Sequence, residues 1–357
     1  MPRRFDFLDS LRGIAALAVV LFHQSDRLGL PGIPVGSYLA VDFFFILSGF
    51  VLTGAYDERL RQGQLGAKEF LVRRIIRLYP LFFAGMVFGF AVKFAKVFVE
   101  PGVEVWTIVD SFLLNLLLVP TPGVDGDPNL FPANGVAWSL FYEFIANAVF
   151  VLVAPRLSTR LLAGLVAVGA LNLVACSLWY GGLDVGANGG ELWGGSSRTA
   201  FGFCTGVLLW RIRGQLSHPG ALGLAGVLSA VLVLTFVLPE PGQTRSWDAL
   251  IVIMVYPPLI LAGAQVALRG RLHALCLWLG ALSFPLYILH LPLCRLVARL
   301  ASRLDVGTQS LGVVAMISVG TVASVLLARF AVPVDARMRV AITRWYQKIA
   351  ARRAVNR

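Results

Sequence analysis

Long apolar runs separated by short polar segments dominate the chain. A helix of about 20 apolar residues crosses the hydrocarbon core of a bilayer, and runs close to this length recur throughout the sequence. The pattern predicts an all-α, polytopic membrane protein with about ten transmembrane helices in one bundle. The expected spans are residues 12–30, 38–56, 78–98, 136–154, 160–180, 197–212, 220–238, 247–267, 276–298 and 310–332.

One further apolar segment, residues 107–120, is short and contains Asp110 and Asn115. We interpret it as re-entrant or interfacial, because segments of this length rarely cross the membrane. If it does not cross, most of the Lys and Arg residues fall on one side of the bilayer. Since such residues collect on the cytoplasmic side, both termini are expected in the cytoplasm and the protein in the inner (cytoplasmic) membrane.

Two parts of the chain differ in composition. Residues 1–332 hold all the apolar spans and are predicted to form the membrane-embedded domain. Residues 333–357 are basic, with apolar residues interspersed. This pattern is typical of an amphipathic helix on a membrane surface, so the second part is predicted to be a cytoplasmic amphipathic tail.

Composition supports the membrane class and limits the partners. Of the 357 residues, 57% are hydrophobic and 14% are charged, whereas about 25% are charged in soluble domains. The net charge of +12 is explained by cytoplasmic Lys and Arg, so a lipid bilayer and not nucleic acid is the expected partner. The four cysteines form no CxxC pair, and no metal site or disulfide is expected.

The first span carries an unusual pair of polar residues, Arg12 and His23. They are eleven residues apart, which is close to three helical turns, so they share a helix face and lie roughly 16 Å apart along the axis. Burial in the span favours the neutral imidazole of His23, which can accept a proton. The alternative is a buried histidine that merely hydrogen-bonds a neighbouring helix.

Four other blocks place ionisable residues in or beside spans, where they are costly and indicate function. Asp42 enters the second span and could be no more than a helix-start carboxylate. Arg74 and Arg77 share a face and could either anchor the helix or clamp phosphates. Glu143 could orient His23, hold the imidazolium or bind an acceptor hydroxyl. A structural role is favoured for His290 over a catalytic one.

The opposite ends of the spans carry further signals. Arg295, Arg299 and Arg303 line one face near the outer end of the ninth span, where they could anchor to headgroups or contact an anionic acceptor. The segments 121–135 and 180–197 are rich in Gly, Pro and Asn and are predicted to be irregular loops. The first is expected to cover an acceptor pocket.

Five motifs, in this order, resemble those of the acyltransferase-3 family over the full chain. They are "LDSLRGIAALAVVLFH", "AVDFFFILSGF", "RRIIRLYP", "WSLFYEF" and "LSFPLYILHLP". The chain departs from the family pattern at Ala40, where glycine is commoner, and at Phe284, where tyrosine is common. Each motif alone is a weak signal, whereas their joint order and spacing are specific.

The resemblance implies a membrane-bound O-acyltransferase that moves an acyl group, with acetyl expected, from cytoplasmic acyl-CoA to a hydroxyl. The acceptor would be a glycan, a lipid-linked sugar or an exported small molecule. His23 would act as general base or transient acyl carrier together with Glu143, and acyl-CoA would bind to Arg74, Arg77 and Arg12. Supporting or acceptor-binding roles are expected for Asp9, Asp42, Trp138, Ser139, Tyr142 and His290.

Two other classes of function are compatible with buried His, Glu and Arg residues. One is a proton-coupled transporter or flippase of envelope precursors. Against it, the sequence shows no inverted-repeat symmetry, and the paired arginines lie at the end of a span and not near the midplane of the membrane. The other is a structural subunit of an envelope-assembly complex. Acyl-CoA is the expected co-substrate, no further cofactor is expected, and the acceptor, the acyl length and the oligomeric state are open.

Overall fold

The computed structural model describes residues 5–30, 33–98, 104–123, 126–154, 156–215, 222–238, 247–306 and 311–355, and within these ranges its regular structure is helical. The only β-type pairing among them is an isolated bridge between Asn129 and Asn188. The all-α class is therefore confirmed. The α-helices are α1 (Asp6–Arg27), α2 (Ala40–Arg61), α3 (Ala67–Phe94), α4 (Val105–Leu116), α5 (Ala137–Val153), α6 (Thr159–Tyr180), α7 (Leu192–Ile212), α8 (Leu222–Val237), α9 (Trp247–Leu250), α10 (Tyr256–Gly263), α11 (Gly270–Arg303) and α12 (Leu311–Val355).

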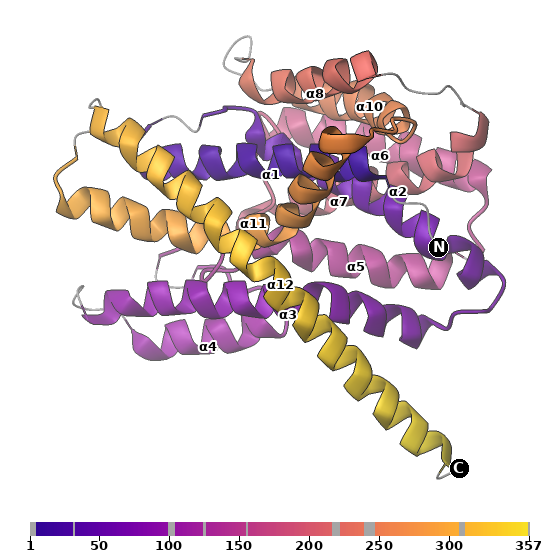
Figure 1. Ribbon diagram of the computed structural model, residues 1–357, viewed down its shortest axis with the longest axis horizontal. Coiled ribbons are helices and arrows are strands. Elements are labelled where there is room, and N and C mark those ends of the chain that lie inside the picture. The colour runs from indigo at the N-terminus through magenta and orange to yellow at the C-terminus, as the bar shows by residue number, and fades with distance from the viewer. Residues whose placement is uncertain are drawn as a thin grey trace.

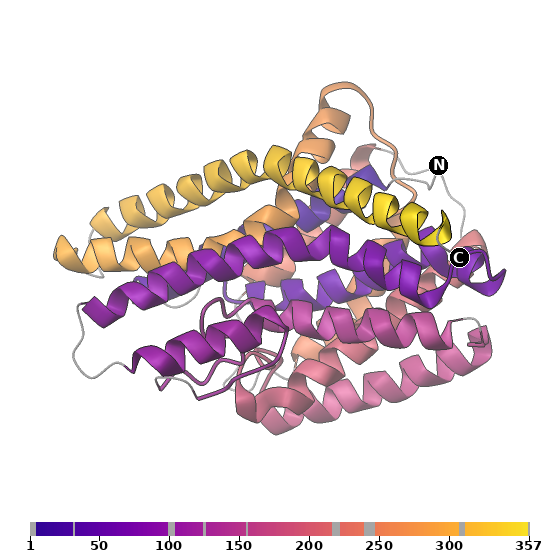
Figure 2. The same cartoon turned by 90° about the horizontal axis from the view of Figure 1, so that it is seen from below.

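The long helices lie side by side in one bundle (Figures 1 and 2). Helix α1 begins and α12 ends at the same end of this bundle, which we call the terminal end. The irregular segments before α5 and before α7 lie toward the opposite end, which we call the loop end. Termini on one side agree with an even number of crossings, and the cytoplasmic placement of the terminal end stays a prediction.

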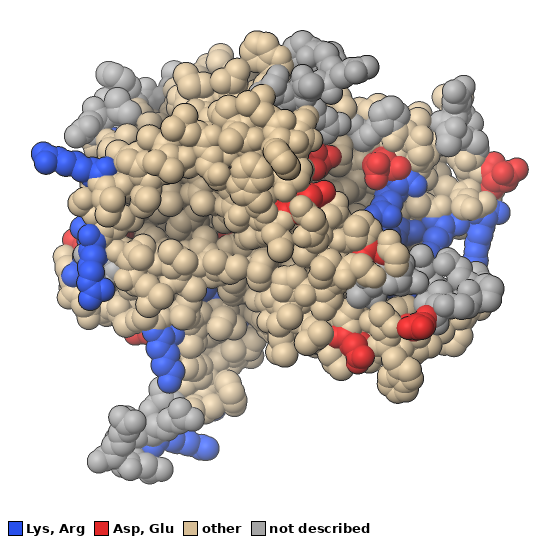
Figure 3. All heavy atoms as spheres, turned by 180° about the vertical axis from the view of Figure 1, so that it is seen from behind, with Lys and Arg blue, Asp and Glu red and all other residues tan. Residues whose placement is uncertain are grey.

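The surface of the bundle suits a lipid environment. Among the described residues, five helical segments are long and apolar enough to cross a membrane: Ser37–Arg61, Ala67–Phe94, Thr159–Tyr180, Gly270–Arg303 and Leu311–Ile349. Large apolar side chains point outward, among them Leu171 and Phe330, which are 73% and 71% exposed. The face in Figure 3 is mostly uncharged. A soluble monomer rarely exposes so large an apolar surface, so the protein is a polytopic membrane protein.

Helix α4 occupies the segment that was predicted not to cross. Its 12 residues span about 18 Å at 1.5 Å per residue, which is less than the roughly 30 Å of hydrocarbon. Asn115 near its end is buried, and its amide donates to the carbonyl oxygen of Val119 at 2.8 Å and to the hydroxyl of Thr121 at 2.9 Å. These bonds fold the chain back toward the loop end.

The predicted span at 247–267 is interrupted. Helices α9 and α10 are joined by a π-helical turn over Ile251–Val255. Pro257 and Pro258 lie in the first turn of α10, and proline lacks the N–H that would continue the regular hydrogen-bond ladder. The turn is therefore a local consequence of the two prolines.

Helix α12 continues across residue 333, where the sequence predicted a boundary between the membrane domain and the tail. Pro333 lies inside the helix without ending it, and one helix runs from the bundle into the basic segment. Its position beside α3 at the terminal end is visible in Figure 2. The placement of this segment on a membrane surface stays a prediction.

Glycines allow two helix pairs to approach closely. A Cβ at Gly206 of α7 would overlap the carbonyl oxygen of Ile46 in α2, and a Cβ at Gly49 would overlap that of Phe203. A Cβ at Gly13 of α1 would lie 2.6 Å from the carbonyl oxygen of Leu279 in α11. Small residues at such contacts bring the backbones of membrane helices together.

We expect Gly206→Ala to destabilise the protein by about 1–3 kcal/mol, because the new methyl group must push α2 away from α7. Thermal unfolding in detergent measures this loss. Gly226→Ala in α8 is the matched control, since a Cβ there meets nothing within 4 Å. Equal melting temperatures for the two variants would contradict the close α2–α7 contact.

Candidate active site

Two of the cavities that the described residues enclose contain most of the predicted site residues. The first, which we call the terminal cavity, has a volume of about 830 Å³ and lies among the terminal-end halves of the helices. The second, the loop cavity, has a volume of about 250 Å³ and lies beneath the loop-end segments. Val41 and Tyr287 line both cavities, so the two spaces meet at these side chains.

The terminal cavity is rich in guanidinium groups. Its lining includes Arg12, Arg73, Arg74, Arg77 and Arg339. A third void of about 550 Å³ also has Arg12, Arg77 and Arg339 in its lining. Guanidinium groups bind phosphate oxygens through paired N–H donors, so this cavity can hold a phosphorylated ligand. The structure thus brings together the three arginines that were expected to bind acyl-CoA.

Arg12 is held at the junction of α1 and α11. Its Nε donates to the hydroxyl of Ser283 at 2.8 Å, and its Nη2 forms an ion pair with Asp9 at 2.9 Å. Asp9 therefore positions the guanidinium on the cavity wall. Ser283, on α11, was not singled out from the sequence as a separate site residue.

Glu143 faces the terminal cavity. Its Oε1 accepts hydrogen bonds from Nη2 of Arg74 at 2.7 Å and from the hydroxyl of Ser48 at 2.8 Å. Of the three roles considered for Glu143, orienting His23 does not fit this structure, because the two residues line different cavities. Its observed contact instead fixes one of the paired arginines.

His23 lines the loop cavity and is bound to a second histidine. Its Nδ1 lies 3.1 Å from Nε2 of His290 and 3.1 Å from the carbonyl oxygen of Val19. The Nδ1 of His290 lies 2.8 Å from the carbonyl oxygen of Tyr287. His290 is fully buried.

These contacts assign the protons of both neutral rings. A carbonyl oxygen only accepts, so Nδ1 of His290 carries a proton and its Nε2 presents a lone pair. Nδ1 of His23 therefore donates to His290, which leaves Nε2 of His23 as the nitrogen with a free lone pair. His290 thus has the role of orienting His23 that was considered for Glu143. Arg12 and His23 share the face of α1 that packs against α11, where they contact Ser283 and His290.

The two loop-end segments form the roof of the loop cavity. The N–H of Leu130 donates to the carbonyl of Ala187 at 2.8 Å, and that of Gly189 donates to the carbonyl of Pro128 at 3.1 Å. The lining includes Asn129, Trp138, Asp184, Asn188 and Glu191. An irregular loop over a pocket was predicted for 121–135, and the second loop completes it.

Asp42 is part of a buried ion pair that the sequence reading missed. Arg198 of α7 donates to both oxygens of Asp42, at 2.7 Å from Nη2 and 3.0 Å from Nε, and both side chains are buried. Its guanidinium also lies 5.3 Å from the ring of Trp138. Asp42 is thus more than a helix-start carboxylate. Arg198, at the start of the predicted span 197–212, was the available signal.

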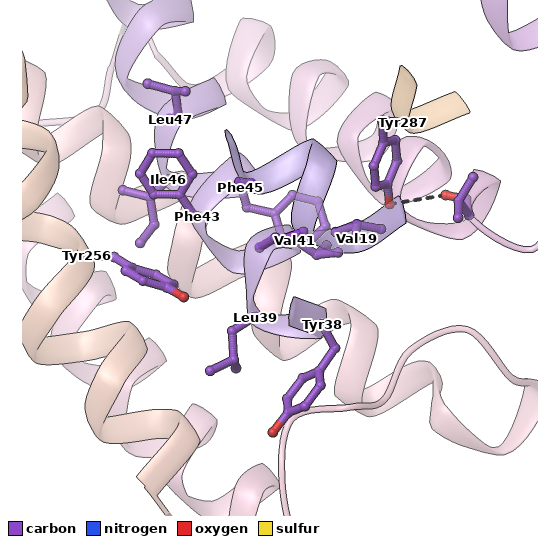
Figure 4. Packing of buried hydrophobic residues seen from close by; sticks show 14 of the residues in the cluster. Val19, Tyr38, Leu39, Val41, Phe43, Phe45, Ile46, Leu47, Tyr256 and Tyr287 are labelled. Carbon is purple, nitrogen blue, oxygen red and sulfur yellow. Dashed lines mark hydrogen bonds between the residues drawn. The ribbon is translucent and has the colours of Figure 1, made fainter. Parts of the chain in front are cut away.

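The remaining predicted residues of α5 have separate partners. The hydroxyl groups of Ser139 and Tyr287 lie 2.7 Å apart at the boundary between the cavities. The hydroxyl of Tyr142 donates to the carbonyl of Leu192 at 3.0 Å and holds α5 against α7. Val41 and Tyr287 are labelled in Figure 4 and belong to the same buried cluster.

The arginines near the end of α11 bind protein carbonyls. Nη1 of Arg295 donates to the carbonyl of Ala133 at 2.7 Å, and Nη1 of Arg299 donates to that of Val92 at 2.8 Å. These bonds fasten the loop-end segment and α3 to α11. The two roles considered for these arginines, headgroup anchor and acceptor contact, stay predictions.

A family model described as "Acyltransferase domain" matches residues 5–329. The chain belongs to the acyltransferase-3 family. This membership confirms the resemblance of the five motifs and makes the protein a membrane enzyme that transfers acyl groups. It favours that class over the transporter and the structural subunit.

Curated relatives agree with the family. The chain is 34% identical over 186 residues to "Protein 2 in picA locus" of Rhizobium radiobacter, covering 49% of this chain and 96% of that protein. It is 27% identical to "Acyltransferase MdmB" of Streptomyces mycarofaciens, covering 84% and 82%. It is 22% identical to "Peptidoglycan O-acetyltransferase OatA" of Listeria monocytogenes, covering 81% of this chain and 49% of that protein. No solved structure matches.

The histidine pair gives a prediction for acyl transfer. His290→Phe fills the buried space but cannot accept the proton of His23, so the ring loses its fixed orientation, and we expect transfer to fall about 10²-fold. His290→Gln, whose amide oxygen can accept, should retain more activity than His290→Phe. Acyl groups are measured by mass spectrometry in a deletion strain that expresses each variant at the same level. Full activity of His290→Phe would contradict the orienting role.

Proposed function

We propose that this acyltransferase moves an acyl group, with acetyl expected, from acyl-CoA to a hydroxyl of a glycan, a lipid-linked sugar or an exported small molecule. Acyl-CoA enters the terminal cavity from the cytoplasm, and the acceptor occupies the loop cavity. This assignment places the terminal end in the cytoplasm, in agreement with the distribution of Lys and Arg. The protein acts in the cytoplasmic membrane.

The arginines of the terminal cavity bind the phosphates of the donor. Arg74 and Arg77 are three residues apart on α3 and line the same wall. Glu143 holds Arg74 in place, and Ser283 holds Arg12. An extended pantetheine arm then carries the thioester toward Val41 and Tyr287, where the two cavities meet.

His23 acts as general base in the loop cavity. Its Nε2 takes the proton of the acceptor hydroxyl while the oxygen attacks the thioester carbonyl. The carbon–sulfur bond then breaks, and the thiolate of CoA receives the proton back from the imidazolium. The product is an ester, and the free thiol leaves with CoA.

The loop cavity suits a polyhydroxylated acceptor. Amide and carboxylate side chains of Asn129, Asp184 and Glu191 stand near the indole of Trp138 in its lining. Polar groups of this kind bind hydroxyls, and an indole offers an apolar face against which a sugar ring can pack. The Asp42–Arg198 pair fixes the wall behind Trp138.

One observation carries this proposal. Nδ1 of His23 donates to His290, which leaves Nε2 as the ring nitrogen with a free lone pair, and His23 lines a cavity that adjoins an arginine-lined one. This arrangement supports proton transfer beside a phosphorylated donor. Names that denote O-acetyl transfer among the relatives support the same chemistry.

His23→Ala is expected to abolish acyl transfer, because general base catalysis typically contributes 10²–10⁴-fold. The variant should keep its expression level and melting temperature. The measurement is mass spectrometry of surface glycans and lipids from a deletion strain that expresses wild type or variant. A normal acyl mass with His23→Ala would overturn the mechanism.

A labelling experiment with wild type and His23→Ala distinguishes direct transfer from transfer through an acyl group on His23. Purified wild type is incubated with radiolabelled acetyl-CoA without acceptor and then denatured. Label that stays on the wild-type protein and is absent from His23→Ala indicates an acyl-imidazole on Nε2. Absence of label from both indicates direct transfer.

Arg74→Ala with Arg77→Ala is expected to weaken coenzyme A binding about 10²- to 10⁴-fold, because two arginines are removed and hydrogen bonds to charged groups contribute roughly 1.5–3 kcal/mol each. Isothermal titration in detergent measures the Kd. Arg160→Ala, exposed at the start of α6, is the control and should leave the Kd unchanged. An unaltered Kd in the double variant would remove the pair from the donor site.

A further inference from the structure

The segment of α12 beyond Pro333 lines the terminal cavity with one helix face. The lining residues are Arg339, Thr343, Tyr346 and Gln347. Their spacing of four, three and one residues puts them on one side of a helix. The exposed residues Arg344 and Trp345 lie on the same segment outside this lining.

This face is held in position by its own contacts. Arg339 forms an ion pair with Asp335, whose side chain is 1% exposed. The hydroxyl of Thr343 donates to the carbonyl of Arg339 at 2.7 Å. Helix α12 packs against α3, which bears Glu69, Arg73 and Arg77 on the opposite wall of the cavity. The segment therefore forms one wall of the terminal cavity.

The chemistry of this wall suits a nucleotide. Arg339 supplies a guanidinium for phosphate, the ring of Tyr346 can stack on a base, and Gln347 offers both an amide donor and an acceptor. The arginines of α3 lie across the cavity. The α12 wall would contact the base and a phosphate of a nucleotide bound between the two walls, and the arginines of α3 would contact its phosphates from the other side.

We propose that the Arg339–Gln347 face binds the nucleotide half of the acyl donor, so that the C-terminal end of α12 selects coenzyme A over shorter thioesters. The inference rests on the proposed function, because it takes the donor to be acyl-CoA. It assigns a binding role to a segment whose sequence reads as a membrane-surface helix. The pantetheine arm extends away from this wall toward Val41 and Tyr287.

The test compares coenzyme A with pantetheine, which lacks the nucleotide. Titration in detergent gives the Kd of each for wild type and for Tyr346→Ala. We expect the preference for coenzyme A over pantetheine to fall about tenfold, since loss of base stacking weakens nucleotide binding. Arg344→Ala is the matched control and should keep the wild-type preference.

A second variant guards against local disruption by the point substitution. A chain that ends at Ile342 keeps Arg339 and the membrane part of α12 but lacks Thr343, Tyr346 and Gln347, and it should lose the same preference. A wild-type preference retained by both Tyr346→Ala and the shortened chain would overturn this inference alone. A wild-type protein that binds no coenzyme A would instead overturn the proposed function.

Discussion

The close approach of α1 and α11 is the contact on which the candidate site depends. Gly13 meets the backbone at Leu279, and Gly280 meets Asp9, so neither position has room for a larger side chain. This spacing lets Arg12 reach Ser283 at one level and His23 reach His290 at another. The guanidinium at the terminal cavity and the imidazole at the loop cavity are thus both positioned by one helix pair.

The buried pair of Asp42 and Arg198 supports the wall of the loop cavity that contains Trp138. Burying two charges costs free energy that their attraction recovers only with good geometry and further hydrogen bonds. Arg198 has such bonds, because it also donates to the carbonyls of Tyr38 and Val185. The guanidinium therefore ties α2, α7 and a loop-end segment together. Its contribution to the site is the fixed position of Trp138.

The division into two cavities separates the tasks of an acyl transferase. The arginines of α3 are grouped in the larger cavity, while His23 faces the smaller one. The loop cavity also has two arginines in its lining, Arg27 and Arg198, and Arg198 is paired with Asp42. In the proposed mechanism, a long thioester would extend from the arginines of α3 past Val41 and Tyr287 to the imidazole of His23.

Local patterns in the sequence determined the helices, the short α4, and the shared face of Arg12 and His23. Apolar length and helical periodicity act over a few turns, so they can be read directly from neighbouring residues. The partners of the buried polar groups were decided only by tertiary structure. His290 is hydrogen-bonded to His23, Arg74 to Glu143, and Arg198 to Asp42, across 267, 69 and 156 residues of chain. Which helices adjoin, and how each is rotated about its axis, fixes these pairs, and the spacing of residues within one helix carries no such information.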